Sequence, residues 1–322
     1  MRRVLISGVA GFIGTNLARQ LVKKKYRVVG LDNLRKGSLA NLAELIGSNQ
    51  FSFHHVDLSD FESFLDTMKR LTSLGLFDEV WHLAANSDIM AGTTDPGIDL
   101  RDTFMTTFNT IRIMKEFQIA VILFASSSAV YGEHSGAMHE DIGPLFPISN
   151  YGAMKLASEA VISAAVDSFL QKAYIFRFPN VVGTPATHGV IHDLVRKLKA
   201  NPKRLDVLGD GNQQKAYLHV RDLIDAMLFI REHSEDKLNY FNIGAPDAGV
   251  TVKFIAENVI KKMSPDAQIV YLGGERGWVG DIPKFSYELS KINNLGWKPK
   301  WSSAESVVKA ISEVAQEISR QH

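Results

Sequence analysis

The sequence predicts an α/β protein: a doubly wound parallel sheet with a smaller α/β lobe towards the C-terminal end. Three observations support this prediction. Short apolar segments alternate with segments of helical spacing as far as Arg177, a glycine-rich turn joins the first of them to a helix, and the alternation becomes irregular after Arg177. Near-continuous apolar strands that alternate with helices are typical of a parallel sheet covered on both faces.

Seven segments rich in Val, Ile, Leu and Phe are the expected strands, and four stretches of helical spacing lie between them. The strands are expected at residues 3–7, 27–31, 51–56, 79–83, 121–125, 173–177 and 240–243, and the helices at 16–24, 61–71, 103–117 and 152–170. Residues 1–177 are expected to form the first domain, which also receives 217–244. Residues 178–216 and 245–322, rich in glycine and proline turns, are expected to form a substrate-binding lobe.

The composition excludes several functional classes. The chain has 36 basic and 35 acidic residues, a formal net charge of +1, so a surface for nucleic acid is not expected. It has no cysteine, which removes disulfides, thiolate metal sites and cysteine nucleophiles. No apolar stretch is long enough for a membrane span, and the N-terminus reads as a strand rather than a signal peptide. We expect a cytoplasmic protein without a membrane partner or a metal site.

Three glycines separate the first expected strand from the first helix. Gly8 permits a tight turn, Gly11 lets a pyrophosphate approach the backbone, and Gly14 lets the helix pack closely on the strand. The backbone N–H groups of Phe12 and Ile13 open the helix, where an anion binds. The spacing is G-x-x-G-x-x-G rather than the commoner G-x-G-x-x-G, so the turn predicts dinucleotide binding only together with its context.

That context is Asp32, at the end of the second expected strand. A carboxylate there accepts hydrogen bonds from an adenosine ribose and repels a 2′-phosphate, which indicates NAD rather than NADP. Arg35 and Lys36 follow closely and weaken this preference, unless they are simply charges of a solvated loop.

Tyr151 and Lys155 are four residues apart and share one face of an expected helix. A phenol is a weak base at neutral pH, but a nearby ammonium and an oxidised nicotinamide both favour the phenolate. Tyr151 can then exchange a proton with a sugar hydroxyl during hydride transfer. An isolated Y-x-x-x-K pattern also fits an ordinary amphipathic helix with a packed tyrosine and a solvated lysine.

The combined pattern resembles the extended short-chain dehydrogenase/reductase family. Within that family it is most similar to the NAD-dependent nucleotide-sugar epimerase and dehydratase branch, of the UDP-glucose 4-epimerase type. The resemblance implies a Rossmann-type fold. The resemblance covers nearly the whole chain. Its motifs are the three glycines, "DNL" at 32–34, "DL" at 57–58, "HLAA" at 82–85, "SSSAVYG" at 126–132, Tyr151 with Lys155, "NVVG" at 180–183 and "LGW" at 295–297.

The resemblance implies roles for individual residues. Tyr151 is the acid/base, Lys155 holds the nicotinamide ribose and lowers the pKa of Tyr151, and Ser127 hydrogen-bonds the reacting hydroxyl. His82 is interpreted as a strand-end residue rather than a catalyst. Further NAD contacts are expected from Asn33, Asp57, Leu58, Leu83, Ala84 and Ala85.

The resemblance also narrows the reaction. Dehydratases of this branch carry a carboxylate pair or a Glu after the active-site Ser or Thr, whereas this chain has Ser128 and Ala129. The same missing Glu argues against decarboxylation, and the missing cysteine argues against 3,5-epimerisation. We expect a 4-epimerase that interconverts C4 epimers of a UDP-hexose or UDP-hexuronate through a 4-keto intermediate. A nucleotide 4-ketosugar reductase is the alternative, and a non-catalytic dinucleotide sensor is a third, weaker one.

Substrate contacts are expected from a set of residues that the resemblance marks out: Ser126, Ser128, Asn180, Val190, Lys215 and Arg276. Lys215 stands where relatives have an arginine, and a lysine neutralises phosphate without a bidentate contact. Phe285 is expected to disfavour N-acetylated sugars. The helices expected at 103–117 and 152–170 are apolar broadly around their circumference, and corresponding family helices pair in a dimer, so we expect a homodimer.

Overall fold

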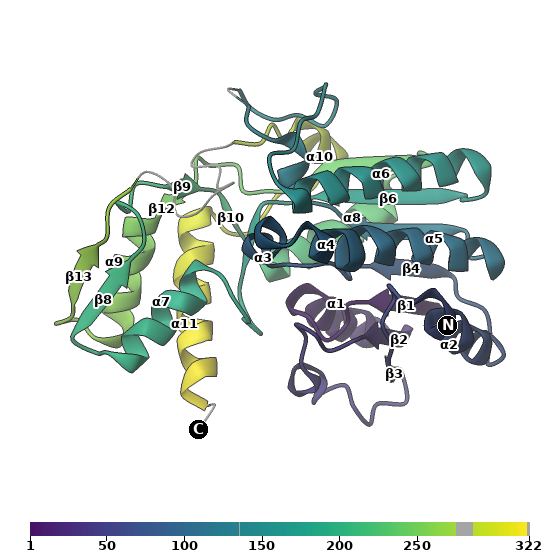
Figure 1. Ribbon diagram of the computed structural model, residues 1–322, viewed down its shortest axis with the longest axis horizontal. Helices are drawn as coiled ribbons and strands as arrows, with labels where there is room; N and C mark the ends of the chain where they lie inside the picture. The colour runs from purple at the N-terminus through teal and green to yellow at the C-terminus, as the bar shows by residue number, and fades with distance from the viewer. Residues whose placement is uncertain (135, 275–285, 321–322) are drawn as a thin grey trace. The chain divides into compact units, whose positions relative to one another are not determined.

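The computed structural model describes residues 1–134, 136–274 and 286–320. The chain forms two compact units (Figure 1). The first comprises residues 1–132, 143–177 and 230–241, and the second comprises 133–142, 178–229 and 242–322. The segment that returns to the first unit is therefore shorter than the 217–244 expected, and residues 133–142 leave the first unit, which the sequence pattern did not indicate.

The first unit contains a seven-stranded sheet with the order β11-β6-β5-β4-β1-β2-β3. Its strands are β1 (Arg3–Ser7), β2 (Arg27–Asp32), β3 (Phe51–His55), β4 (Glu79–His82), β5 (Val121–Ala125), β6 (Lys172–Arg177) and β11 (Leu238–Asn242). The pairs from β3 through to β6 are all parallel. The order reverses between β1 and β4, which is where open α/β sheets bind ligands. The predicted fold class is confirmed.

Helices cover the sheet on both faces because successive strand residues point to opposite sides. On one face α2 (Phe61–Thr72), α5 (Thr106–Glu116) and α6 (Asn150–Ser168) pack on a core of strand residues, and α5 and α6 lie side by side (Figure 1). Helix α1 (Phe12–Lys23) packs on β1 and β2. The core of the first face includes Leu5, Val29, Phe64, Met68, Val80, Ile113, Ile122, Phe124, Ile162 and Ile175.

Between β4 and α5 the chain departs from the single helix expected at 103–117. Two short helices, α3 (Ile89–Thr94) and α4 (Pro96–Asp99), lead into the π-helix η2 (Leu100–Met105), which continues as α5. Aspartates begin α3 and α4, because Asp88 and Asp95 accept hydrogen bonds from the backbone N–H groups of Ala91 and Gly97. The 3₁₀ helices η1 (Leu39–Leu42) and η3 (Ser128–Tyr131) follow β2 and β5.

The second unit has its own apolar core, formed mainly by three helices. These are α7 (Val190–Ala200), α9 (Val252–Met263) and α11 (Ser303–Arg320). Its other elements are β7 (Asn180–Val182), β8 (Arg204–Val207), β9 (Gln214–Lys215), β10 (Tyr217–His219), β12 (Val250–Thr251), β13 (Gln268–Tyr271) and α10 (Ser290–Leu295), while α8 (Val220–His233) runs into the first unit. Among the described residues, no helix has the length and apolar character required to cross a bilayer.

Candidate functional site

The glycine turn after β1 is closely packed, and only glycine fits two of its positions. Gly8 has φ +70°, and a Cβ there would lie 2.8 Å from the backbone nitrogen of Ala84. A Cβ on Gly14 would lie 2.1 Å from the carbonyl oxygen of Gly8, so this glycine lets α1 start close to β1. Gly11 precedes α1 without a side-chain cap, which leaves the start of the helix, at Phe12 and Ile13, suited to an anion.

Asp32 ends β2 beside this turn and is held by two backbone donors. Its Oδ2 accepts from the N–H of Ala10 at 3.0 Å, and its Oδ1 accepts from the N–H of Leu34 at 2.8 Å. Burial raises the pKa of Asp32, and these two hydrogen bonds lower it in part. Carboxylate oxygens accept several hydrogen bonds each, so the fixed carboxylate fits the role of a ribose acceptor.

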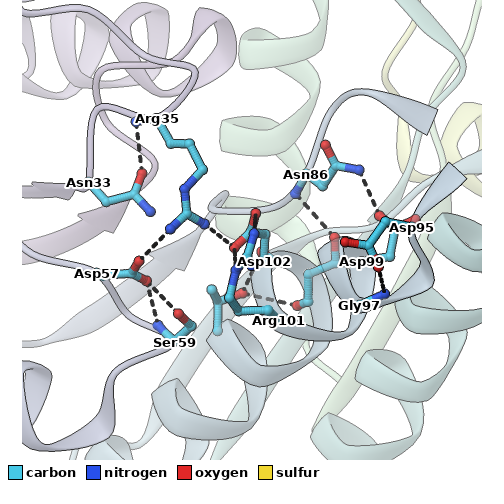
Figure 2. Close-up of polar contacts among 12 residues, drawn as sticks. Asn33, Arg35, Asp57, Ser59, Asn86, Asp95, Gly97, Asp99, Arg101 and Asp102 are labelled. Carbon is cyan, nitrogen blue, oxygen red and sulfur yellow. Dashed lines mark hydrogen bonds and ion pairs between the residues drawn. The ribbon is translucent and has the colours of Figure 1, made fainter. Parts of the chain in front are cut away.

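The other expected cofactor residues surround this edge of the sheet. Asn33 accepts from the N–H of Arg35 at 3.0 Å, and Asp57 lies in the turn after β3, where it accepts from Ser59 (Figure 2). Leu58 is buried. The segment 83–85 follows β4. The backbone N–H groups of Leu83 and Ala84 donate to the hydroxyl of Ser7 at 3.1 and 3.3 Å.

Tyr151 and Lys155 both lie on α6, whose first turn is capped by Ser149. Lys155 is buried, with 2% of its surface exposed, and its Nζ donates to the carbonyl oxygen of Ala125 at 2.6 Å. The same Nζ lies 4.7 Å from the ring centroid of Phe124 and 5.8 Å from that of Tyr151. The alternative of a solvated lysine on an ordinary amphipathic helix is therefore wrong.

Ser127 precedes η3, its hydroxyl accepts from the N–H of Ala129 at 3.2 Å, and it lies close enough to Tyr151 to influence the pKa of that phenol. Burial raises the pKa of Tyr151 to about 12, the side chain of Ser127 lowers it, and the charge of Asp99 raises it. The protein's own groups therefore keep the phenol protonated at neutral pH.

Ser126, the neighbour of Ser127, belongs to a buried network under the site. Its hydroxyl donates to Oε1 of Glu159 at 2.5 Å. Arg177 donates to the same carboxylate through Nε at 3.0 Å and Nη2 at 2.7 Å, and to the hydroxyl of Tyr131 at 2.9 Å. Ser126 is 1% exposed, so this geometry does not support the substrate contact expected for it. Ser128 is half-buried at the start of η3.

Asp99 is a second buried carboxylate close to Tyr151 and Lys155. Its Oδ1 accepts from the amide of Asn86 at 2.9 Å (Figure 2). Its Oδ2 has no hydrogen-bond partner among the residues that the structure describes. This oxygen faces Gly92, where a Cβ would lie 1.7 Å away, and the Gly92 carbonyl accepts from Asn150, the neighbour of Tyr151, at 2.9 Å.

Lys155 depends on both buried carboxylates. Burial lowers its pKa to about 7, and the charges of Glu159 and Asp99 raise it. Glu159 is already paired with Arg177, so part of its charge is compensated. The negative charge of Asp99 is therefore less compensated by a neighbouring cation than that of Glu159.

The expected substrate residues outside the first unit lie on separate elements of the second. Asn180 is exposed at the start of β7, Val190 begins α7, and Lys215 lies in β9 opposite Val250. Arg276 and Phe285 fall outside the described residues.

A family model described as the NAD-dependent epimerase/dehydratase family matches residues 4–244. The chain belongs to this family. Its cofactor is therefore NAD, in agreement with the glycine turn and with Asp32. The resemblance stated from the sequence motifs is confirmed.

Three relatives define the similarity more closely. The family member is 27% identical to a UDP-glucose 4-epimerase of Halalkalibacterium halodurans, over 95% of this chain and 93% of the relative. It is 32% identical to a solved UDP-galactose 4-epimerase, with a TM-score of 0.84, covering 98% and 99% of the two chains. A UDP-glucuronic acid 4-epimerase of Bacillus cereus, solved with UDP-glucuronic acid and NAD, is 25% identical, with a TM-score of 0.84 and the same coverages.

The sequence reasoning missed the buried charges of this family member. A signal existed for two of them: Arg177 interrupts an apolar strand, and Glu159 follows Lys155 by one helical turn. No pattern marked Asp99. His82 agrees with its interpretation, because it is fully buried, contacts the hydroxyls of Ser7 at 2.7 Å and Thr107 at 3.0 Å, and burial lowers its pKa to about 3.

We predict that Glu159→Gln is strongly destabilising and that adding Arg177→Met restores part of the loss. The single variant leaves the Arg177 guanidinium buried without its carboxylate, which costs about 3–5 kcal/mol in comparable pairs. Denaturant titration of both variants measures the free energy of unfolding. Glu232→Gln, which breaks the exposed pair with Lys24, is the matched control and is expected to have little effect. Equal losses in the single and double variants would contradict the prediction.

We predict that Asp99→Asn lowers the pKa of Tyr151. The charge of Asp99 favours the protonated phenol, so its removal makes deprotonation easier and moves the titration to lower pH. Ultraviolet difference spectra of tyrosinate in the NAD-loaded protein, with Tyr151→Phe as the blank, measure this pKa. Asp66→Asn, on the exposed surface of α2, is the control. An unchanged or raised titration midpoint in Asp99→Asn contradicts the prediction.

Proposed function

We propose that this protein is an NAD-dependent nucleotide-sugar 4-epimerase, an isomerase. The single observation that carries the proposal is the burial of Lys155 one turn along α6 from Tyr151, with its Nζ 5.8 Å from the tyrosine ring centroid and Ser127 close to the same phenol. This arrangement supplies one acid/base group and one donor for a sugar hydroxyl. No further acid or base is required for epimerisation at a single carbon.

The proposed reaction uses Tyr151 twice. The phenolate accepts the proton of the C4 hydroxyl as the sugar becomes a 4-keto intermediate, and Ser127 hydrogen-bonds the same oxygen. When bound, NAD supplies the hydride acceptor and donor, and the positive charge of its oxidised nicotinamide favours the phenolate. Lys155 holds the nicotinamide ribose and stabilises the phenolate. After the 4-keto sugar turns over, C4 takes back the hydride on its opposite face and Tyr151 returns the proton to the oxygen on C4.

Dehydration and decarboxylation receive no support from the segment that follows Ser127. Ser128 and Ala129 begin η3, and neither carries a carboxylate. Glu159 is the nearest acid in sequence on α6, but its oxygens are engaged by Arg177 and Ser126. Within the described segment 128–131 and on α6, no carboxylate is therefore free at the position where dehydratases and decarboxylases carry their additional acid.

The proposed substrate is a UDP-hexose or a UDP-hexuronate. The support is the set of relatives, which act on UDP-glucose, UDP-galactose and UDP-glucuronic acid according to their names. We assign the phosphate and sugar contacts to Asn180, Val190, Lys215 and Arg276, in a substrate-binding lobe, with Ser128 on the NAD-binding side. Such an activity belongs in the cytoplasm, where nucleotide sugars for polysaccharide biosynthesis are made.

A 4-ketosugar reductase is the second candidate, because it requires the same three catalytic residues. Asp32 favours NAD, which suits an enzyme that keeps its cofactor rather than one supplied with NADPH. A dinucleotide sensor has no use for a buried lysine beside a tyrosine, and the free-energy cost of burying Lys155 argues against this reading.

We expect one sugar of a UDP-sugar panel to convert reversibly to its C4 epimer with catalytic NAD. NMR of the anomeric protons detects the product, and ultraviolet absorbance detects net NADH. Tyr151→Phe removes the acid/base group and is expected to lower the rate by at least about 100-fold, while Tyr26→Phe, at a half-buried position between α1 and β2, serves as the control. Turnover that needs a 4-keto sugar and stoichiometric reduced cofactor identifies the reductase instead.

We also propose a homodimer formed through α5 and α6. Leu100 and Phe108 are 49% and 39% exposed on η2 and α5, and Phe108 stacks on Phe104 with ring centroids 6.1 Å apart. Light scattering is expected to give twice the chain mass, and Phe108→Glu is expected to give the monomer because it places a charge on this apolar face. Leu74→Glu, at a 73% exposed site on another segment, should remain dimeric. A monomeric wild-type protein contradicts the proposal.

A further inference from the structure

The loop after β2 carries two cations, and both are paired with carboxylates from other segments. Figure 2 shows the pairs of Arg35. Arg35 donates through Nη2 to Oδ2 of Asp57 at 3.0 Å and through Nη1 to Oδ1 of Asp102. Lys36 lies 3.2 Å from Oδ2 of Asp88. Asp102 and Asp88 both belong to the segment between β4 and α5, so this segment supplies negative charge to the loop.

The position of Arg35 gives these pairs a functional meaning. The loop begins at Asp32, the ribose acceptor, and an arginine close to that position is the residue type that accommodates the 2′-phosphate of NADP. A guanidinium binds a phosphate best when two of its N–H groups are free to donate together. In this structure the two terminal nitrogens of Arg35 donate to two different carboxylates.

Asp102 is the better anchored of the two partners. Arg101 donates to both of its oxygens, from Nε at 2.8 Å and from Nη2 at 3.0 Å, and the Asp102 side chain is only 14% exposed. Asp57 is 29% exposed, and its Oδ1 accepts from the N–H and the hydroxyl of Ser59. The backbone N–H of Arg35 also donates to Asn33, which fixes the origin of the side chain.

We propose that Asp102 is a cofactor-specificity residue, which pairs with Arg35 and so withholds its guanidinium from a 2′-phosphate. Asp32 repels that phosphate directly, and Asp102 removes the one nearby group that could compensate for the repulsion. The selection of NAD is thus shared between an acid at the end of β2 and an acid 70 residues later in η2. This inference concerns the cofactor and does not depend on which sugar the protein uses.

The test compares the dissociation constants of NAD and NADP by isothermal titration calorimetry. Asp102→Asn keeps the size of the side chain and removes its charge, so it is expected to improve NADP binding relative to NAD by about five- to tenfold. The gain should shrink at high salt, because the pairs are partly exposed. In the double variant Asp102→Asn/Arg35→Ala the gain should disappear.

Three controls separate this effect from others. Asp66→Asn removes a carboxylate from an exposed pair on α2 and should leave the ratio unchanged. Arg101→Ala in the Asp102→Asn background should keep the gain, because the proposal assigns it to Arg35. Asp102→Ser is the second variant if Asp102→Asn does not fold, and thermal melting checks both.

Two results overturn the proposal. In the first, the NADP to NAD ratio of Asp102→Asn and of Asp102→Ser equals that of the wild type. In the second, the gain persists after Arg35→Ala, which means that the lost carboxylate acts through its own charge or through Arg101. Because the readout is binding, a wrong sugar assignment leaves both results interpretable.

Discussion

The burial of one ammonium group organises the first unit of this protein. Lys155 lies under the end of β5 with its Nζ on the carbonyl oxygen of Ala125, at 2% exposure. A buried charge requires hydrogen bonds and counter-charges, since desolvation otherwise neutralises it. Glu159 and Asp99 supply the counter-charge from two different elements, and each of these acids needs its own support.

The support for each acid explains features that otherwise look unrelated. Glu159 is held by Arg177 and Ser126, which anchors the chain just after β5, where Ser127 precedes η3. Asp99 is held by Asn86, and its carboxylate fits only because Gly92 has no side chain. The burial of Lys155 therefore constrains Arg177 on β6, Gly92 on α3 and Asp99 on α4. None of these elements is the helix that carries Lys155 and Tyr151.

Features that neighbouring residues specify, such as strand positions and turns, could be predicted from the sequence. Periodicity located the seven strands of the sheet to within two residues at each end, and the glycines marked the tight turn between β1 and α1, because a turn and its following helix are specified by adjacent residues. The pairs of Arg35 with Asp57 and Asp102 join residues distant in sequence, so no local pattern reveals them. The π-helix η2 and the two short helices before it were missed for the same reason, since their geometry depends on packing against α6.

Three consecutive serines at the end of β5 show how this local and tertiary information combine. Ser126 and Ser127 follow β5, which ends at Ala125, and Ser127 keeps an extended backbone before Ser128 begins η3. Ser126 reaches the buried carboxylate and Ser127 reaches Tyr151, although their side chains are chemically identical. The motif alone could not separate these roles. The position of Glu159 separates them, because its carboxylate engages the hydroxyl of Ser126 and leaves that of Ser127 outside the buried network.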